Sequence, residues 1–170
     1  IQANGRYLYV PEGVQMVGGK VTVPLSVLVK AFDARLSWDA ASGTVVVNRG
    51  SGAIQSGDSY YNQDDLFWLS RIIQAECGNQ PLEGRMAVGN VVLNRVKNPA
   101  FPSTVKGVLS QKNQFTTWKN GALANRTPNA TSVIAAKLVL DGGEVESTKG
   151  ATFFDSKSNS WAARNKTCVA

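Results

Sequence analysis

A chain of 170 residues, of which 43% are hydrophobic and 18% charged, is long enough for one ordinary domain or two small ones, and its composition is neither disordered nor fibrous. The chain contains no histidine, which excludes serine and cysteine nucleophiles activated by histidine and removes the commonest zinc ligand. Carboxylates are then the main groups available for proton transfer near neutral pH. We expect no metal site and no cofactor.

The net charge of +6 suits an anionic partner, such as nucleic acid, a membrane surface or a bacterial cell wall, and equally well a surface that is merely solvated. No run of basic residues supports nucleic acid as a partner, and no apolar run is long enough to span a membrane. The chain begins at Ile1 without an apolar leader, which indicates either a removed export signal or a trimmed chain.

Residues 1–50 have the pattern of a small β/α module. A Gly18-Gly19 pair between apolar extended segments is typical of a hairpin turn, and Pro24 marks the start of a helix. Four apolar residues of this helix share one face by their spacing: Leu25, Leu28, Val29 and Phe32. In chain order we predict extended segments at Tyr7 and Tyr9, strands over 14–17 and 20–23, a helix from residue 24, and strands over 35–38 and 44–48.

The second part of the chain is predicted to be mainly helical. Residues 51–62 are rich in glycine and serine and predict a linker, after which a domain over 63–170 follows. We predict helices over 64–75, 81–97 and 127–141, and a further helix that follows Pro102 through Val105, Val108 and Leu109. A short β excursion or loop is expected over 113–118, and an extended segment over 151–154. The fold class is therefore α+β.

Glu76 shares a helix stripe with apolar residues. Leu69, Ile72, Ile73 and Glu76 fall at i, i+3, i+4 and i+7, which predicts that the carboxylate projects on a buried face. Burial disfavours the charged form and raises the pKa, and the negative end of the helix dipole acts in the same direction. A carboxyl that keeps its proton near neutral pH is what a general acid for glycosidic-bond cleavage requires.

The sequence marks no second carboxylate for this chemistry. Glycosidases generally use two, but Glu83 is expected at the surface and Asp155 in a loop. One acid/base suffices where a hydroxyl of the substrate attacks, so a lone Glu76 is compatible with lytic transglycosylation. The alternative is a structural role, with Glu76 in solvent at the helix end or paired with one of three arginines: Arg71, Arg85 or Arg95.

The run over residues 69–96, together with Phe101-Pro102, Val108, Gln114-Phe115 and 151–154, closely resembles the SleB/CwlJ-type cell-wall hydrolases, the spore-cortex-lytic enzymes. The resemblance covers about residues 64–161. It implies a lysozyme-like fold and a lytic transglycosylase that cleaves the MurNAc–GlcNAc bond with a 1,6-anhydro product, Glu76 matching the catalytic acid/base. Many members carry a second Glu where this chain has Gln80. A hydrolytic muramidase or glucosaminidase and a non-catalytic wall-binding protein remain alternatives.

The first module resembles a different family, the copper amine oxidase N-terminal-like domain. The matching segments are 18–25, 32–34, 36–39 and 44–47. With no histidine in the chain and no cysteine in this module, a copper site is not expected. The resemblance implies either a wall-attachment module or a folded spacer.

Aromatic and polar residues beyond Glu76 are candidates for substrate binding. We expect roughly two of five aromatic residues to stack on sugar faces, and the others to be core: Phe115, Trp118, Phe153, Phe154 and Trp161. Gln114, Thr116 and Thr117 would bond glycan hydroxyls or stabilise a turn. Asn94 and Arg95 are expected in a buried network.

Cys77 and Cys168 permit one disulfide, but two free thiols fit equally well. The resemblance implies peptidoglycan as the partner, from spore cortex or vegetative wall. It also implies a secreted protein that acts at the cell envelope or spore cortex, which we expect to be a monomer.

Overall fold

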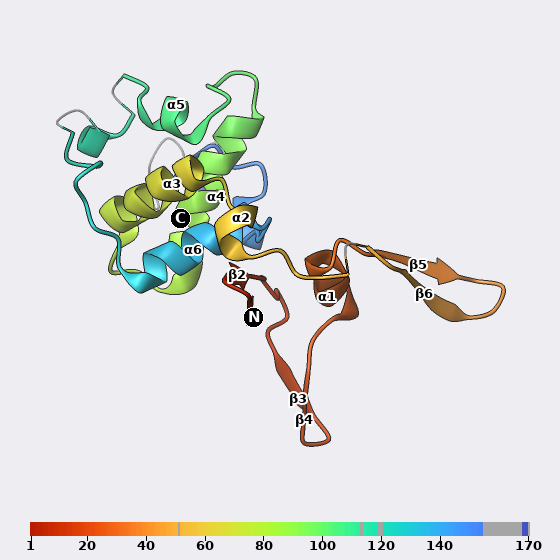
Figure 1. Cartoon of the computed structure of the whole chain (residues 1–170). Helices are drawn as coiled ribbons and strands as arrows, with labels where there is room; N and C mark the ends of the chain where they lie inside the picture. Colours follow the sequence, from red (N-terminus) through yellow and green to blue (C-terminus); the bar gives the residue numbers. More distant parts are fainter. Residues whose placement is uncertain (51, 113, 119–120, 155–167, 170) are drawn as a thin grey trace. The chain divides into compact units, whose positions relative to one another are not determined.

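The computed structural model describes residues 1–50, 52–112, 114–118, 121–154 and 168–169. The chain divides into two compact units, Ile1–Tyr60 and Tyr61–Ala170 (Figure 1). The boundary falls within the interval 51–62 that the sequence predicts as a linker, and this interval also contains a short helix, α2 (Gly57–Tyr60). None of the helices in these ranges is long and apolar enough to cross a membrane.

The first unit consists of two-stranded antiparallel hairpins and short helices. Its further elements are β1 (Gln2–Ala3), β2 (Arg6–Tyr7), β3 (Gln15–Val17), β4 (Lys20–Thr22), α1 (Leu25–Ala31), β5 (Arg35–Asp39) and β6 (Thr44–Asn48). The hairpin turn predicted at Gly18-Gly19 is confirmed, with φ of 57° and 74°, a region that glycine enters without steric cost. The helix after Pro24 and the strands around residue 40 are also confirmed.

The apolar face predicted for α1 is largely uncovered. Val29 is buried, but Leu25, Leu28 and Phe32 are 45%, 37% and 38% exposed. They line a shallow hollow together with Val47 of β6. The helix is therefore confirmed, but three of the four residues that share its apolar face stay exposed.

The second unit is mainly helical, so the chain as a whole mixes helix and strand as predicted. Its elements are α3 (Gln63–Cys77), α4 (Leu82–Lys97), α5 (Val105–Leu109), η1 (Thr116–Trp118), α6 (Ala130–Leu140), η2 (Glu146–Thr148), β7 (Phe153–Phe154) and β8 (Cys168–Val169). Helices α3, α4 and α6 pack on one another, and α5 packs against α3 and α4 (Figure 1). Strand β7 pairs in parallel with β8.

At the starts of two helices, a side chain accepts hydrogen bonds from backbone N–H groups that have no partner within the helix. Asn62 accepts hydrogen bonds from the backbone N–H groups of Asp64 and Asp65 at 3.0 and 3.1 Å, which fixes the start of α3. Thr104 does the same for α5 through the N–H of Gly107 at 3.0 Å. Helix α4 begins directly after Pro81, as predicted.

Two predicted elements are corrected by the structure. Helix α6 begins at Ala130 rather than at Thr127-Pro128, because Asn129 caps it by accepting a hydrogen bond from Ser132 N–H at 2.9 Å. The described part of 113–118 contains no strand; residues 116–118 form the 3₁₀ helix η1.

The core of the second unit lies between α3, α4 and α6. Leu69, Ile72 and Ile73 of α3 are fully buried, as are Val91 and Val92 of α4 and Ala135 and Ala136 of α6. Gly89 brings α4 close to both of the other helices, since a Cβ placed there would lie 2.9 Å from Val139 Cγ2 and 3.2 Å from Ile73 Cδ1. The helices therefore meet at a contact that has no room for a side chain.

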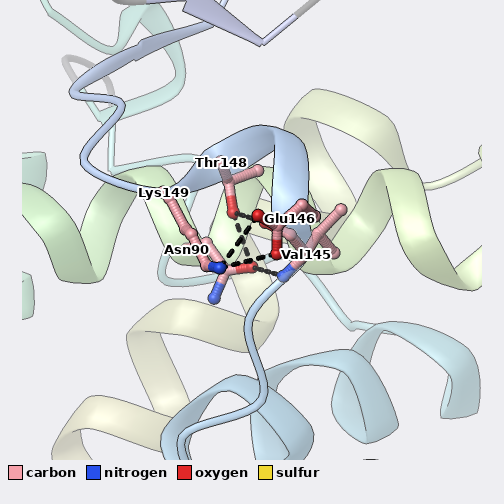
Figure 2. A network of polar contacts seen from close by, with 5 residues as sticks. All are labelled: Asn90, Val145, Glu146, Thr148 and Lys149. Carbon is pink, nitrogen blue, oxygen red and sulfur yellow. Dashed lines mark hydrogen bonds and ion pairs between the residues drawn. The ribbon is translucent and has the colours of Figure 1, made fainter. Parts of the chain in front are cut away.

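A buried asparagine on α4 ties down the segment that follows α6. Asn90 donates to the carbonyl of Gly143 at 2.8 Å. Its Oδ1 accepts from Val145 N–H and the Thr148 hydroxyl at 3.0 and 3.2 Å (Figure 2). These three hydrogen bonds of the amide thus all go to residues 143–148, which include η2. The ion pair between Glu146 and Lys149 lies at the exposed edge of this network.

The close contact at Gly89 predicts that replacing a glycine of α4 with alanine affects the Tm differently at positions 89 and 84. Gly89→Ala should lower the Tm by about 3 °C, since overpacking by about 1–3 kcal/mol outweighs the gain in helix propensity. Gly84→Ala, whose nearest neighbour would be Gln80 Cβ at 3.3 Å, should leave the Tm unchanged or raise it. Thermal unfolding followed by circular dichroism measures both, and equal effects would contradict the proposed close packing.

Candidate active site

Glu76 lies in the last turn of α3, at the point where the buried stripe of this helix reaches the surface. The residues before it on the stripe are buried, but Glu76 itself is exposed. The predicted buried side chain is therefore wrong, because the stripe continues beyond the part of α3 that the other helices cover. Neighbouring atoms still remove enough water to raise the pKa of the Glu76 carboxyl above its ordinary value.

Two polar groups act on the carboxyl of Glu76 against this desolvation. The Arg126 cation and the Thr117 hydroxyl both lower the pKa of Glu76, by less than desolvation raises it. Thr117 lies in η1, and its buried Oγ1 has no hydrogen-bond partner of standard geometry within the described chain. The structure thus brings together an acid from α3, a hydroxyl from η1 and a cation from the loop before α6.

The three arginines considered as partners of Glu76 are directed elsewhere. Arg71 donates to the carbonyls of Ala124 and Phe67 at 3.3 and 3.2 Å, and stacks on the Phe67 ring. Arg85 and Arg95 are buried and bond to other groups. A structural ion pair with any of them is therefore contradicted. A position in solvent at the helix end agrees with the exposure of Glu76.

Some of the predicted substrate-binding residues are exposed, and others are buried or half-buried. Thr116 and Gln114 are exposed, and Gln114 Oε1 accepts from Arg95 Nη1 at 3.1 Å. Phe115 is only 4% exposed, so its ring belongs to the core rather than to a sugar-binding face. Trp118 is half-buried and lies against Trp68, with ring centroids 4.9 Å apart.

Strand β7 carries the other two aromatic candidates, and both are half-buried. Phe154 packs on the core cluster of Val91 and Ala151 and faces the Phe115 ring at 6.5 Å between centroids. The Arg95 guanidinium lies 5.1 Å from the Phe153 ring centroid. Trp161 lies outside the described residues.

The buried network predicted for Asn94 and Arg95 is confirmed. Asn94 donates to the carbonyls of Thr148 and Ala151 at 2.8 and 3.0 Å. Arg95 donates to the carbonyl of Thr152 at 2.6 Å, and burial lowers the pKa of its guanidinium. Both side chains hold the chain that leads into β7, and Arg95 also orients Gln114.

Two groups that act on Glu76 were not connected with it by the sequence: Thr117, a candidate only for glycan or turn contacts, and Arg126. Trp68, which was not a candidate, lies on the same helix as Glu76 and packs on Trp118. Thr117 and Arg126 are 41 and 50 residues away from Glu76, and no local pattern connects residues at such a separation.

Cys77 is a free, buried thiol in the structure. Its Sγ donates to the carbonyl of Ile73 at 3.2 Å, and burial raises the pKa of the thiol to about 11. The Cys77 side chain is thus turned into the helical core, while the side chain of Cys168, its candidate disulfide partner, lies outside what the structure describes. The described ranges hold no group of three or more His, Cys, Asp or Glu residues able to bind a metal ion.

The second unit resembles a known class of proteins in sequence. The sequence profile of the cell wall hydrolase family matches residues 79–170, more than half of the chain, so the chain belongs to this family. The matched range begins just beyond Glu76.

Relatives within this class are spore proteins of bacilli. The chain is 38% identical over 81 residues to a spore cortex-lytic enzyme of Bacillus cereus, covering 48% of this chain and 30% of that protein. It is 33% identical over 81 residues to the one of Bacillus subtilis, covering 48% of this chain and 25% of that protein. The chain thus spans about a third or less of the length of the curated relatives it matches.

A solved structure is also similar. It is the catalytic domain of the germination-specific lytic transglycosylase SleB from Bacillus anthracis, with 30% identity, a TM-score of 0.51, and coverage of 66% of this chain and 88% of that one.

The raised pKa of Glu76 predicts a pH-dependent gain in stability for Glu76→Gln. When the pKa of a carboxyl is higher in the folded than in the unfolded state, its protonated form stabilises the fold at pH values below the unfolded pKa. This stabilisation is lost as the pH rises through the pKa of the folded state. At pH 7 the uncharged glutamine should therefore raise the Tm, by on the order of 1 °C, and near pH 3 the difference should vanish.

Glu83→Gln is the matched control for this measurement. It removes the same charge from the first turn of α4, where a negative charge favours the helix, so no gain at pH 7 is expected. A gain for Glu76→Gln that persists at pH 3 would contradict a raised pKa.

Proposed function

We propose that this chain cleaves the glycan strands of peptidoglycan at the MurNAc–GlcNAc bond, as a lytic transglycosylase with Glu76 as its single general acid/base. The observation that carries the proposal is the setting of Glu76: a carboxyl at the solvent edge of a rigid helix, with a raised pKa and without an arginine ion pair in the described chain. Membership of the cell wall hydrolase family and the lytic transglycosylase activity named for a relative support it.

The raised pKa of Glu76 fits the first step of this reaction. The protonated carboxyl donates its proton to the glycosidic oxygen as the bond to C1 of the muramic acid breaks, and the GlcNAc end leaves with that proton. The carboxylate so formed gains the attraction of Arg126 and a hydrogen-bond donor in the Thr117 hydroxyl. Both groups stabilise the charge at the moment when it appears.

The second step returns the proton to Glu76. The C6 hydroxyl of the muramic acid attacks C1, and the carboxylate accepts its proton, which leaves a 1,6-anhydro ring and restores the acid. No water is consumed and no second carboxylate takes part. Within the described chain this agrees with a site in which Glu76, Thr117 and Arg126 are the groups brought together.

Glu76→Gln tests the assigned acid/base. Clearing of insoluble peptidoglycan, measured by turbidity, should fall by about 10²–10⁴-fold, because an amide cannot transfer the proton. Sedimentation of the variant with the wall should persist, since the substitution is nearly isosteric. Glu83→Gln should clear the wall at the normal rate. Full clearing by Glu76→Gln would remove Glu76 from the mechanism.

Mass spectrometry of the digestion products tests the reaction type. Digestion of spore cortex and of vegetative wall should release fragments that end in 1,6-anhydro-muramic acid, 18 Da lighter than hydrolysed ends. Reducing MurNAc ends would instead show a muramidase, and reducing GlcNAc ends a glucosaminidase. If the unmodified protein clears neither wall type, the non-catalytic wall-binding alternative gains. The paired digestion also shows which wall is the substrate.

We further propose that the first unit is a copper amine oxidase N-terminal-like module that attaches the protein to the wall. One face of the β5–β6 hairpin carries only apolar side chains, all of them exposed: Leu36, Trp38, Val45 and Val47. Trp38 is 64% exposed, and an open indole face is suited to the apolar face of a sugar. A module that served only as a spacer would not require an exposed apolar surface of this kind.

Substitutions on the two faces of this hairpin test whether the first unit attaches the protein to the wall or is only a folded spacer. In the Glu76→Gln background, which leaves the wall intact, Trp38→Ser should weaken sedimentation with peptidoglycan about tenfold. Val46→Ser, on the opposite face of the same hairpin, should have little effect. Equal binding by both variants would favour a spacer.

A further inference from the structure

Arg85 is a buried cation that bonds to neutral groups on three segments. It lies in the first turns of α4 and is 7% exposed. Its Nη2 donates to the carbonyl of Gly78 at 2.5 Å, and its Nε to the carbonyl of Gln80 at 2.7 Å. Its Nη1 donates to Asn129 Oδ1 at 2.6 Å and to the Ser132 hydroxyl at 2.8 Å. Burying a guanidinium for this purpose is costly, so the contacts need a reason.

The two carbonyls belong to the segment that follows Glu76 directly. Helix α3 ends at Cys77, and residues 78–80 connect it to α4. The last carbonyls of a helix have no partner within the helix, and here Arg85 supplies one to Gly78. The final turn of α3, which carries Glu76, is thereby fixed at its open end.

The same two residues of α6 also hold α3 on the other side of Glu76. Gln74 Oε1 accepts from the backbone N–H of Asn129 and from the Ser132 hydroxyl, both at 3.0 Å. Glu76 therefore stands between Gln74 and Gly78, and both are connected to the start of α6, one directly and one through Arg85. The position of the carboxyl relative to α6 is set from both sides.

Arg85 acts on Glu76 through position rather than through its charge. The cation that lowers the pKa of Glu76 is Arg126, whereas Arg85 acts on the neighbouring Cys77 thiol. Four bonds in different directions also require the planar fork of arginine, because a lysine presents one compact ammonium group.

We propose that Arg85 is a positioning residue for the reaction at Glu76: it clamps the end of α3 to the start of α6 and so fixes where the carboxyl meets the glycosidic bond. This inference rests on the proposed function of Glu76. Displacement of a catalytic group by about 1 Å costs on the order of 10² in rate, so loss of the clamp should lower turnover more than substrate binding.

Arg85→Lys tests the clamp, with Asn90→Ala as the matched control. Asn90 is a buried polar residue of the same helix, but its bonds go to residues 143–148, away from α3 (Figure 2). With soluble glycan fragments as substrate, Arg85→Lys should lower kcat about 10- to 100-fold and change KM by less than threefold. Asn90→Ala should lower the Tm but keep kcat per folded molecule.

A second readout observes Glu76 without any reaction. In ¹³C NMR of the side-chain carboxyls, Glu76 of the unmodified protein should titrate above the ordinary range, and Arg85→Lys should move its titration to lower pH as the freed helix end becomes hydrated. Asn90→Ala should leave it in place. Should Arg85→Lys fail to fold, Asn129→Ala removes one acceptor of the clamp at an exposed position and should give the same shift with a loss in kcat of about threefold or more.

Normal kcat together with an unchanged Glu76 titration in these variants would overturn the clamp, even where Glu76→Gln is inactive. If Glu76→Gln instead remains active, the proposed function fails. The NMR titration would still show whether Arg85 positions the carboxyl.

Discussion

The contact of α3 with α4 and α6 is the constraint on which the second unit depends. Leu69, Ile72 and Ile73 are fully buried in it, and Gly89 lets the helices approach without an intervening side chain. A helix fixed along this stripe can hold a polar group at its end without loss of order. Glu76 is that group. Packing against α4 and α6 fixes α3, and the last turn of α3 carries the Glu76 carboxyl at its surface.

Buried polar side chains of α4 fix the connecting segments that the apolar core does not hold. Asn90, Asn94 and Arg95 bind backbone groups of the chain after α6, and Arg85 binds those after α3. Each of these residues lies on α4, so one helix organises two connecting segments that have little regular structure of their own. Buried polar networks of this kind select one arrangement of loops, because every alternative leaves donors or acceptors unsatisfied.

The parts of the fold that depend on local pattern were predictable. Capping at Asn62, the Gly18-Gly19 turn and the stripe of α3 require only residues close in sequence. The position of Glu76 on the stripe followed from the same spacing, but its exposure did not, because the spacing cannot show where the covering helices end. Whether Phe115 binds sugar or belongs to the core could not be decided for a similar reason: it is buried in the fold, and the ring of Phe154 beside it lies 39 residues later.

The groups around the acid depend on contacts between distant parts of the chain. Thr117 and Arg126 reach Glu76, and Asn129 reaches Arg85, only after the helices have packed. The start of α6 was misplaced for this reason, since the preference for Thr127-Pro128 is local, while Asn129 is held by partners on α3 and α4. The first unit shows the converse, because its local turns formed as expected while most of its large apolar side chains stayed exposed.

The thiol beside the acid has a chemical consequence of its own. With its pKa raised to about 11, the Cys77 thiol stays protonated at pH 7, and the thiolate is the form that oxidants and alkylating reagents attack. Although Cys77 is next to Glu76 in the sequence, its sulfur points into the core and donates to Ile73. The thiol next to the acid is therefore a poor target for thiol reagents.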